Sequence, residues 1–267
     1  MFTTLEITRC QGIATLWMNR PEVHNAFNAV LISELEAACR LLEADPDVRI
    51  VVLAGRGKNF SAGADLNWMK AAGMADAETN LEDARRLASM FRTLAEMSKP
   101  TVARVQGAAL GGGMGLAAAC DICIASESAS FATSEVRLGI VPGVISPYVM
   151  RAIGERQASR YFLSAERISA SRALSIGLAH EVVPVDRLEA KMDEILSALL
   201  AGGPQAQAAA KHLIRAVVNR PVDDALIETS ARSIAGLRAS AEAREGLDAF
   251  LSKRQPGWLS SKELHGV

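Results

Sequence analysis

The sequence of 267 residues carries almost no excess charge of either sign. It has 29 lysine and arginine residues against 30 aspartate and glutamate residues, so its formal net charge is −1 at pH 7. Proteins that bind nucleic acid or an acidic membrane surface through their overall field need a strong positive excess. The composition therefore excludes both as expected partners, and an anionic ligand has to be held by a few local charges.

Cysteine and histidine are scarce, with four of each. The cysteines, Cys10, Cys39, Cys120 and Cys123, are too few and too scattered for a disulfide framework. The CxxC of Cys120 and Cys123 straddles the junction of an Ala-rich helical pattern and an apolar strand pattern, which is typical of buried structural thiols rather than a redox site. The histidines show no ligand spacing, so we predict no metal site.

Long hydrophobic runs are missing as well. The longest uncharged stretch, Val105 to Cys120, is shorter than a membrane span and contains five glycines. Residues Met1 to Glu6 lack the basic and apolar regions of a secretory signal and carry no Arg-rich presequence. We expect a cytoplasmic protein.

What the sequence does contain is an alternation of strand and helix patterns over its first two thirds. A hydrophobic content of 49% is ample for a large core. Helical stripes at Leu31 to Leu42 and Ala84 to Met97 separate apolar strand patterns. The predicted strands are Thr4–Arg9, Ile13–Met18, Arg49–Ala54, Thr101–Val105, Ile122–Ala125, a short one near Phe131, Arg167–Ser169 and Glu181–Val183. This alternation predicts an α/β core.

From about Asp186 onward the sequence predicts only helices. Four apolar stripes follow one another, with breaks at Gly202-Gly203-Pro204, Pro221 and Ser240. We therefore divide the chain into a core of residues 1–190 and a helical region of residues 191–267. So many apolar stripes at a chain end predict packing on another subunit.

Two glycine-bearing stretches are the most informative local feature: Ser61-Ala62-Gly63-Ala64-Asp65 and Gly111-Gly112-Gly113-Met114-Gly115. Each follows a strand pattern and leads into a helix pattern, so each can leave a backbone N–H free at a strand-to-helix turn. Two converging donors form an oxyanion hole, in which loss of one donor typically costs ~3 kcal/mol of barrier. Either stretch alone is equally compatible with an ordinary turn. Together they predict chemistry at or next to a carbonyl group.

The two stretches lie about 48 residues apart and are followed by Phe131-Ala132-Thr133-Ser134-Glu135-Val136-Arg137-Leu138-Gly139-Ile140-Val141-Pro142-Gly143. Together with the Asn19 to Asn28 segment and the Gly246 to Arg254 segment, this order of motifs closely resembles the enoyl-CoA hydratase/isomerase (crotonase) family. The resemblance covers nearly the whole chain. Within the family, the Glu135 to Arg156 region is most similar to bacterial hydratases of 3-methylglutaconyl-CoA and isohexenylglutaconyl-CoA.

The resemblance implies a spiral of ββα turns followed by C-terminal helices that build homotrimers, usually paired as hexamers. It implies that Ala64 and Gly112 donate the oxyanion-hole N–H groups and that Glu135 is the acid/base. It further implies a coenzyme A path, with coenzyme A present as part of the substrate and no permanently bound cofactor. The residues implied on this path are Val23, His24, Ala62, Asp65, Phe250 and Lys253, the last two often across a subunit boundary.

One departure from the family pattern bears on the reaction. Two-carboxylate hydratases of this family carry Glu where this chain has Gly115, so only Glu135 is present. Hydration of the 2,3-double bond by a single carboxylate is the expected reaction, because the methylglutaconyl-type hydratases can also lack the first Glu. A Δ3,Δ2-enoyl-CoA isomerase with Glu135 as its base is the alternative. Glu135 could instead form a salt bridge with Arg137 or help to cap the next helix at Ser134.

Two other protein classes remain as alternatives. Gly113 to Ala118 matches the GxGxxA pattern of dinucleotide binding, but a strand pattern begins at Ile122, too soon for the full helix which that motif requires. A non-catalytic or RNA-binding use of the same fold is disfavoured by the pI of about 6.5. The acyl group, the group that positions water and the choice between trimer and hexamer are not fixed by the sequence. Arg137 is a candidate partner for an acyl group that ends in a carboxylate.

Overall fold

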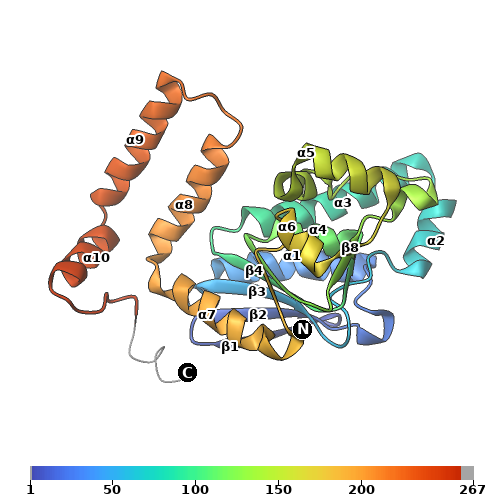
Figure 1. Cartoon of the computed structure of the whole chain (residues 1–267), viewed down its shortest axis with the longest axis horizontal. Helices are drawn as coiled ribbons and strands as arrows, with labels where there is room; N and C mark the ends of the chain where they lie inside the picture. Colours follow the sequence, from blue (N-terminus) through green and yellow to red (C-terminus); the bar gives the residue numbers. More distant parts are fainter. Residues whose placement is uncertain (1, 260–267) are drawn as a thin grey trace.

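A six-stranded sheet lies at the centre of the computed structural model, which describes residues 2–259 (Figure 1). Its order is β1-β2-β3-β4-β6-β9; β1 pairs antiparallel with β2, and the other neighbours are parallel. The strands are β1 (Leu5–Cys10), β2 (Ile13–Met18), β3 (Ile50–Gly55), β4 (Thr101–Val105), β6 (Ile122–Ser126) and β9 (Glu181–Val183). The predicted α/β core is confirmed.

Both faces of this sheet are covered, and β3 shows how the sequence encodes it. All six of its residues are buried. Successive side chains of a strand point to opposite faces, so this means that helices cover the strand on both sides. Val51 and Leu53 join the core under α1 (Ala29–Ala44), α3 (Ala77–Glu96) and α4 (Gly112–Ala119). Ile50 and Val52 pack against α7 (Leu188–Ala201) on the other face. Thus α7 covers the sheet although its residues after 190 fall in the predicted helical region.

A second, three-stranded sheet stands beside α4. It has the order β5-β7-β8, with β5 (Ala108–Leu110), β7 (Ser130–Ala132) and β8 (Ile168–Ser169). Around it lie α2 (Leu66–Met74), η2 (Glu135–Leu138), α5 (Ser146–Ser164) and α6 (Ala170–Ser175). Two further short 3-10 helices are η1 (Pro21–Val23) and η3 (Val185–Arg187). β5 precedes the second glycine stretch, and a separate parallel bridge between Ser61 and Ala109 joins it to the first.

The last three helices leave the body of the molecule. α8 (Pro204–Val217), α9 (Asp224–Arg238) and α10 (Ala241–Leu251) form an extension on the side away from α2 and α5 (Figure 1). We call residues 204–251 the C-terminal arm. α8 packs on α9 and α10, and large apolar side chains such as Ile214, Val222, Ile227 and Leu247 stay exposed on the arm. In residues 2–259 no helix is long and apolar enough to cross a membrane.

Candidate active site

The two glycine stretches run side by side in register. Ser61 and Ala109 form a parallel β-bridge, with the Ser61 N–H donating to the Ala108 carbonyl at 3.0 Å and the Leu110 N–H to the Ser61 carbonyl at 2.9 Å. Two residues further along each segment, Gly63 lies against Gly111, since a Cβ on Gly111 would lie 3.9 Å from the Gly63 Cα. The approach is so close that a Cβ on Gly63 would lie 2.8 Å from the Leu110 carbonyl oxygen, so glycine is required there.

Both predicted donor N–H groups are free of partners in residues 2–259. Ala64 bridges Phe27 in parallel fashion, because the Phe27 N–H donates to the Gly63 carbonyl and the Asp65 N–H to the Phe27 carbonyl. In that pattern the N–H of Ala64 itself points away from Phe27. The N–H of Gly112 is the first of α4 and has no acceptor within that helix. The geometry is that of two adjacent donors, with the positive end of the α4 dipole behind one of them.

Glu135 stands directly against this pair of turns. It begins η2, and a Cβ placed on Gly111 would lie 3.1 Å from its Oε1 atom. Gly111 has φ 50° and ψ −117°, a conformation that side chains avoid. The Oε2 atom is buried and has no hydrogen-bond partner in residues 2–259. A buried carboxylate oxygen without a partner is rare, and such an atom beside the two glycine turns is a candidate for contact with a ligand.

Burial raises the pKa of Glu135 above its ordinary value of 4.5. Neither structural role considered from the sequence is observed. Glu135 forms no ion pair with a described residue, Arg137 included, and the Ser134 side chain does not cap η2. The acid/base prediction therefore has a geometric basis.

The space at Gly115 is filled by apolar side chains. A Cβ on Gly115 would lie 2.4 Å from Ile145 Cγ2 and 3.0 Å from Phe91 Cε1. Phe91 in turn stacks on Tyr148, with ring centroids 5.6 Å apart. Glu135 is thus the carboxylate of this site, and an aromatic and aliphatic wall stands in place of a second one. Sequence reasoning noted Gly115 but had no signal for Ile145 as the side chain that fills the space.

Three of the predicted coenzyme A contacts lie together. Val23 and His24 sit at the end of η1, where the His24 carbonyl accepts the N–H of Ala62 at 2.9 Å. Fully buried Asn25 fixes this loop: its side-chain amide donates to the carbonyls of Arg56, Asn59 and Phe60. Sequence reasoning quoted Asn25 only as part of a motif, although a buried Asn that satisfies three carbonyls is what places the loop.

The structure gives the side chain of Asp65 other partners than a ligand. Its carboxylate is 3.0 Å from Arg20 Nη2 and accepts the Asn67 N–H at 2.9 Å as the N-cap of α2. Side-chain and backbone hydrogen bonds outweigh burial and keep the pKa of Asp65 below its ordinary value. Each carboxylate oxygen of Asp65 is thus engaged by a protein group, and the residue caps α2 next to the Ala64 turn.

Phe250 and Lys253, the last two predicted contacts, lie far along the chain's own arm. Phe250 is on α10 and is 81% exposed, and Lys253 is exposed just beyond it. Figure 1 places α10 on the opposite side of the molecule from α2 and α5. One copy of the chain therefore does not bring these two residues to its own Glu135.

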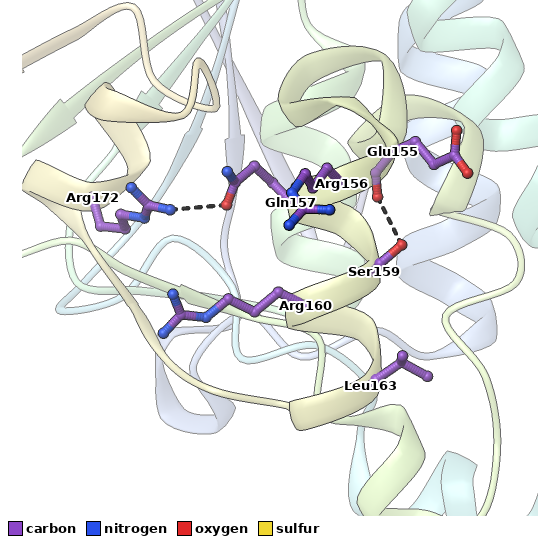
Figure 2. A pocket seen from close by; sticks show the side chains of 7 residues that line it. All are labelled: Glu155, Arg156, Gln157, Ser159, Arg160, Leu163 and Arg172. Carbon is purple, nitrogen blue, oxygen red and sulfur yellow. Dashed lines mark hydrogen bonds between the residues drawn. The ribbon is translucent and has the colours of Figure 1, made fainter.

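The surface hollow in Figure 2 is a different place. It has a volume of about 770 Å³ and lies on the second half of α5, against α6. Two of its arginines have protein partners: Arg172 donates to Gln157 at 2.8 Å, and Arg160 forms an ion pair with Glu166 outside the hollow. The hollow contains none of the predicted site residues.

Two other features behave as the sequence predicts. Cys120 and Cys123 are buried and unpaired, and burial raises the pKa of Cys123 to about 12, so the CxxC is structural. α4 ends at Ala119 and β6 begins at Ile122, which leaves no room for a dinucleotide-binding helix. Residues 2–259 contain no cluster of three or more His, Cys, Asp or Glu side chains that could hold a metal ion.

This combination is an α/β fold in which two glycine turns with partnerless N–H groups lie against one buried carboxylate. The family described as enoyl-CoA hydratase/isomerase matches residues 8–261. The chain belongs to the enoyl-CoA hydratase/isomerase family, and the predictions of the crotonase fold and of an enzyme are confirmed.

Several relatives and solved structures are similar over nearly the whole chain. A putative enoyl-CoA hydratase/isomerase from Legionella pneumophila is 44% identical, with a TM-score of 0.91 and coverage of 97% of this chain and 100% of the other. An enoyl-CoA hydratase from Shewanella pealeana is 43% identical, with a TM-score of 0.94 and 96% of each chain covered. The 2,3-dehydroadipyl-CoA hydratase of Escherichia coli is 34% identical over 94% of this chain and 97% of its own.

Proposed function

We propose that the chain hydrates the 2,3-double bond of an enoyl-CoA thioester. The observation that carries the proposal is the group of three partnerless polar groups, the N–H donors of Ala64 and Gly112 and the Glu135 carboxylate. The thioester oxygen accepts both N–H groups, which stabilise the enolate that forms when water adds at C3. Coenzyme A enters as part of the substrate, and these steps use no resident cofactor.

The proton balance is carried by Glu135 alone. Its carboxylate takes a proton from the attacking water as the oxygen bonds to C3. The resulting carboxylic acid then gives a proton to C2 of the enolate, which restores the carboxylate. A raised pKa suits this role because it makes the carboxylate a better base than an ordinary glutamate.

A second candidate reaction has a specific observation in its favour. Because Ile145 and Phe91 fill the space at Gly115, the site offers water one carboxylate rather than two. A single base is sufficient for a Δ3,Δ2-isomerisation, in which Glu135 removes a proton from one carbon of the allylic unit and returns it to the other.

For the acyl group we propose a branched glutaconyl-type chain that ends in a carboxylate, such as 3-methylglutaconyl-CoA. Arg137 lies two residues beyond Glu135 on η2, is exposed, and forms no ion pair with a described residue. The apolar wall at Gly115 places no negative charge against such a chain. The Escherichia coli relative is named for 2,3-dehydroadipyl-CoA, whose acyl group comes from a dicarboxylic acid.

We also propose that the chain assembles as a homotrimer, or a pair of trimers, in the cytoplasm. The exposed apolar side chains of the arm need a partner, and Phe250 and Lys253 are displayed where only another copy could use them. Lys253 then supplies a local cation for a polyanionic ligand in a protein that has no net positive field.

A substrate panel tests the proposal. Crotonyl-CoA, 3-hexenoyl-CoA and 3-methylglutaconyl-CoA are incubated with the enzyme, and the conjugated thioester is followed by its ultraviolet absorbance. We expect a higher kcat/KM for the glutaconyl thioester than for crotonyl-CoA, and we expect Arg137→Ala to narrow the gap by about tenfold. Equal or better hydration of crotonyl-CoA contradicts the substrate, whereas conversion of 3-hexenoyl-CoA alone makes the chain an isomerase.

A further inference from the structure

A buried ion pair joins the C-terminal arm to the core. Lys211 on α8 is only 9% exposed, yet it carries a charged group that the reaction does not use. Its Nζ lies 2.5 Å from Asp121 Oδ2 and donates to the Lys99 carbonyl at 2.8 Å. Burial of a lysine is costly, and the pair is kept only because a carboxylate and a carbonyl meet the ammonium.

The acceptor belongs to the end of the helix that presents the oxyanion hole. Asp121 follows Cys120, the C-cap of α4, and the N-terminus of α4 carries Gly112. The same carboxylate oxygen accepts the Thr101 N–H at 2.7 Å and the Thr101 hydroxyl at 2.8 Å, so it is fixed to the start of β4. Lys211 therefore contacts a rigid point of the core.

A second cation on the same face of α8 also holds this helix against the core. Arg215, one turn beyond Lys211, donates to the carbonyls of Ala95 and Glu96 at the end of α3. A hollow of about 130 Å³ opens beside these groups, lined by Tyr148 and Arg151 among others. Lys211 is the buried residue of α8, so little apolar packing supports the angle of this helix on the core.

Hydrogen bonds within the arm link the orientation of α8 to the position of α10. Glu242 on α10 accepts the N–H groups of Gln205 and Ala206 at the start of α8, at 2.9 and 2.8 Å. α8 and α10 are thus tied together, and a rotation of α8 on the core displaces Phe250 and Lys253.

From this arrangement we infer that Lys211 is a positioning residue, whose ion pair with Asp121 aims the arm so that α10 reaches the coenzyme A site of a second copy. The part of the inference that places α10 at a coenzyme A site rests on the proposed function. The part that Lys211 sets the orientation of the arm rests on the contacts of Lys211 alone.

The test compares Lys211→Met, Lys211→Arg and Lys191→Met in the full chain. Lys191 is the matched control because it forms a 2.6 Å ion pair with Glu194 within α7. Hydrogen exchange of α8–α10 is measured against that of β3 and β4, together with KM and kcat for the enoyl-CoA thioester. For Lys211→Met we expect at least ~10-fold faster exchange in the arm and a KM raised ~10-fold, with unchanged exchange in the strands and kcat within about twofold. Lys211→Arg is expected to keep the exchange rate of the arm and the KM at their wild-type values. Lys191→Met is expected to change neither the exchange rate of the arm nor the KM.

Unchanged exchange and KM in Lys211→Met would overturn the inference, and so would faster exchange in β3 and β4 with a parallel loss of kcat. The double variant Lys211→Met/Asp121→Asn separates aiming from the cost of a stranded carboxylate. It is expected to resemble Lys211→Met, and wild-type behaviour would overturn the inference. Exchange is measured without substrate. Inactivity toward every thioester therefore refutes the proposed function while the aiming role still stands on the exchange result.

Discussion

At the scale of single residues, the site is made by groups that the fold leaves without partners. Glu135 Oε2 is buried with no hydrogen bond, and the N–H groups of Ala64 and Gly112 have no acceptor in residues 2–259. A buried polar atom without a partner is rare and costs stability, so the Oε2 atom of Glu135 calls for an explanation. A ligand that supplies a carbonyl oxygen and exchangeable protons would provide partners for this atom and for the two N–H groups.

Replacement of Glu135 by Gln should lower kcat by at least ~10²-fold and leave the binding of a coenzyme A thioester nearly unchanged. The amide keeps the size of the side chain but cannot carry a proton. Steady-state kinetics and a titration with a saturated acyl-CoA measure the two effects. Glu155→Gln, on the exposed side of α5, is the control. Near wild-type turnover in the Glu135 variant contradicts the assignment.

The raised pKa of Glu135 predicts a pH dependence of stability with a definite sign. Its folded-state pKa exceeds the unfolded one, so its stabilising contribution is present below the ordinary value of 4.5 and is lost as the pH rises through the raised value. Glu135→Gln should therefore have a higher Tm than the wild type near neutral pH, with the difference vanishing by about pH 4. Thermal unfolding across this range measures it, and a lower Tm for the variant at neutral pH would refute the stated cause of the shift.

At the scale of elements, the packing of α4 on α5 explains why this site has one carboxylate. Gly115 is fully enclosed by Ile145 and Phe91. The wall was invisible in the sequence, because Ile145 precedes α5 by one residue and lies thirty positions from Gly115.

Gly115→Ala should destabilise the fold by about 1–3 kcal/mol, since its methyl group would overlap Ile145 Cγ2. Ile145→Ala removes that methyl group. The double variant should therefore be more stable than the sum of the single changes predicts, with a coupling of about 0.5–3 kcal/mol. Urea unfolding of the four proteins measures the coupling. Strict additivity would mean that the contact is relieved elsewhere.

Other elements show where sequence reasoning was sufficient. The strands of the large sheet were predictable because runs such as Ile50 to Ala54 are apolar on both faces, and the arm helices because their stripes keep helical spacing. The strand β5, at Ala108–Leu110, was missed, since three residues between glycines carry no period. The site prediction placed Glu135, Ala64 and Gly112 together through the resemblance. The engagement of Asp65 with Arg20 depends on a contact across 45 positions that no local pattern encodes.

At the scale of the whole molecule, the arm is the part that a single copy does not use. Its large apolar side chains, Ile214, Ile227, Leu247 and Leu251 among them, stay largely exposed. We interpret this surface as the interface of the proposed trimer.

Deletion of all residues after Gly236 should give monomeric or aggregated protein that no longer binds coenzyme A. The deletion removes α10 with Phe250 and the Glu242 carboxylate that caps α8, and it leaves an apolar stripe exposed. Analytical ultracentrifugation and a coenzyme A titration measure the result. A truncated protein that is trimeric and active would contradict both the assembly and the role of α10.

The register between Ser61 and Ala109 has a consequence for how this protein can change over evolution. The two donor N–H groups are aligned by local strand pairing, not by the length of chain between them. The intervening segment, which includes α2 and α3, can therefore gain or lose residues at its exposed connections without moving either donor. Insertions there would change the surface around α2 and α3 while the two glycine turns stay fixed. Substrate range and chemical step are thus free to diverge separately.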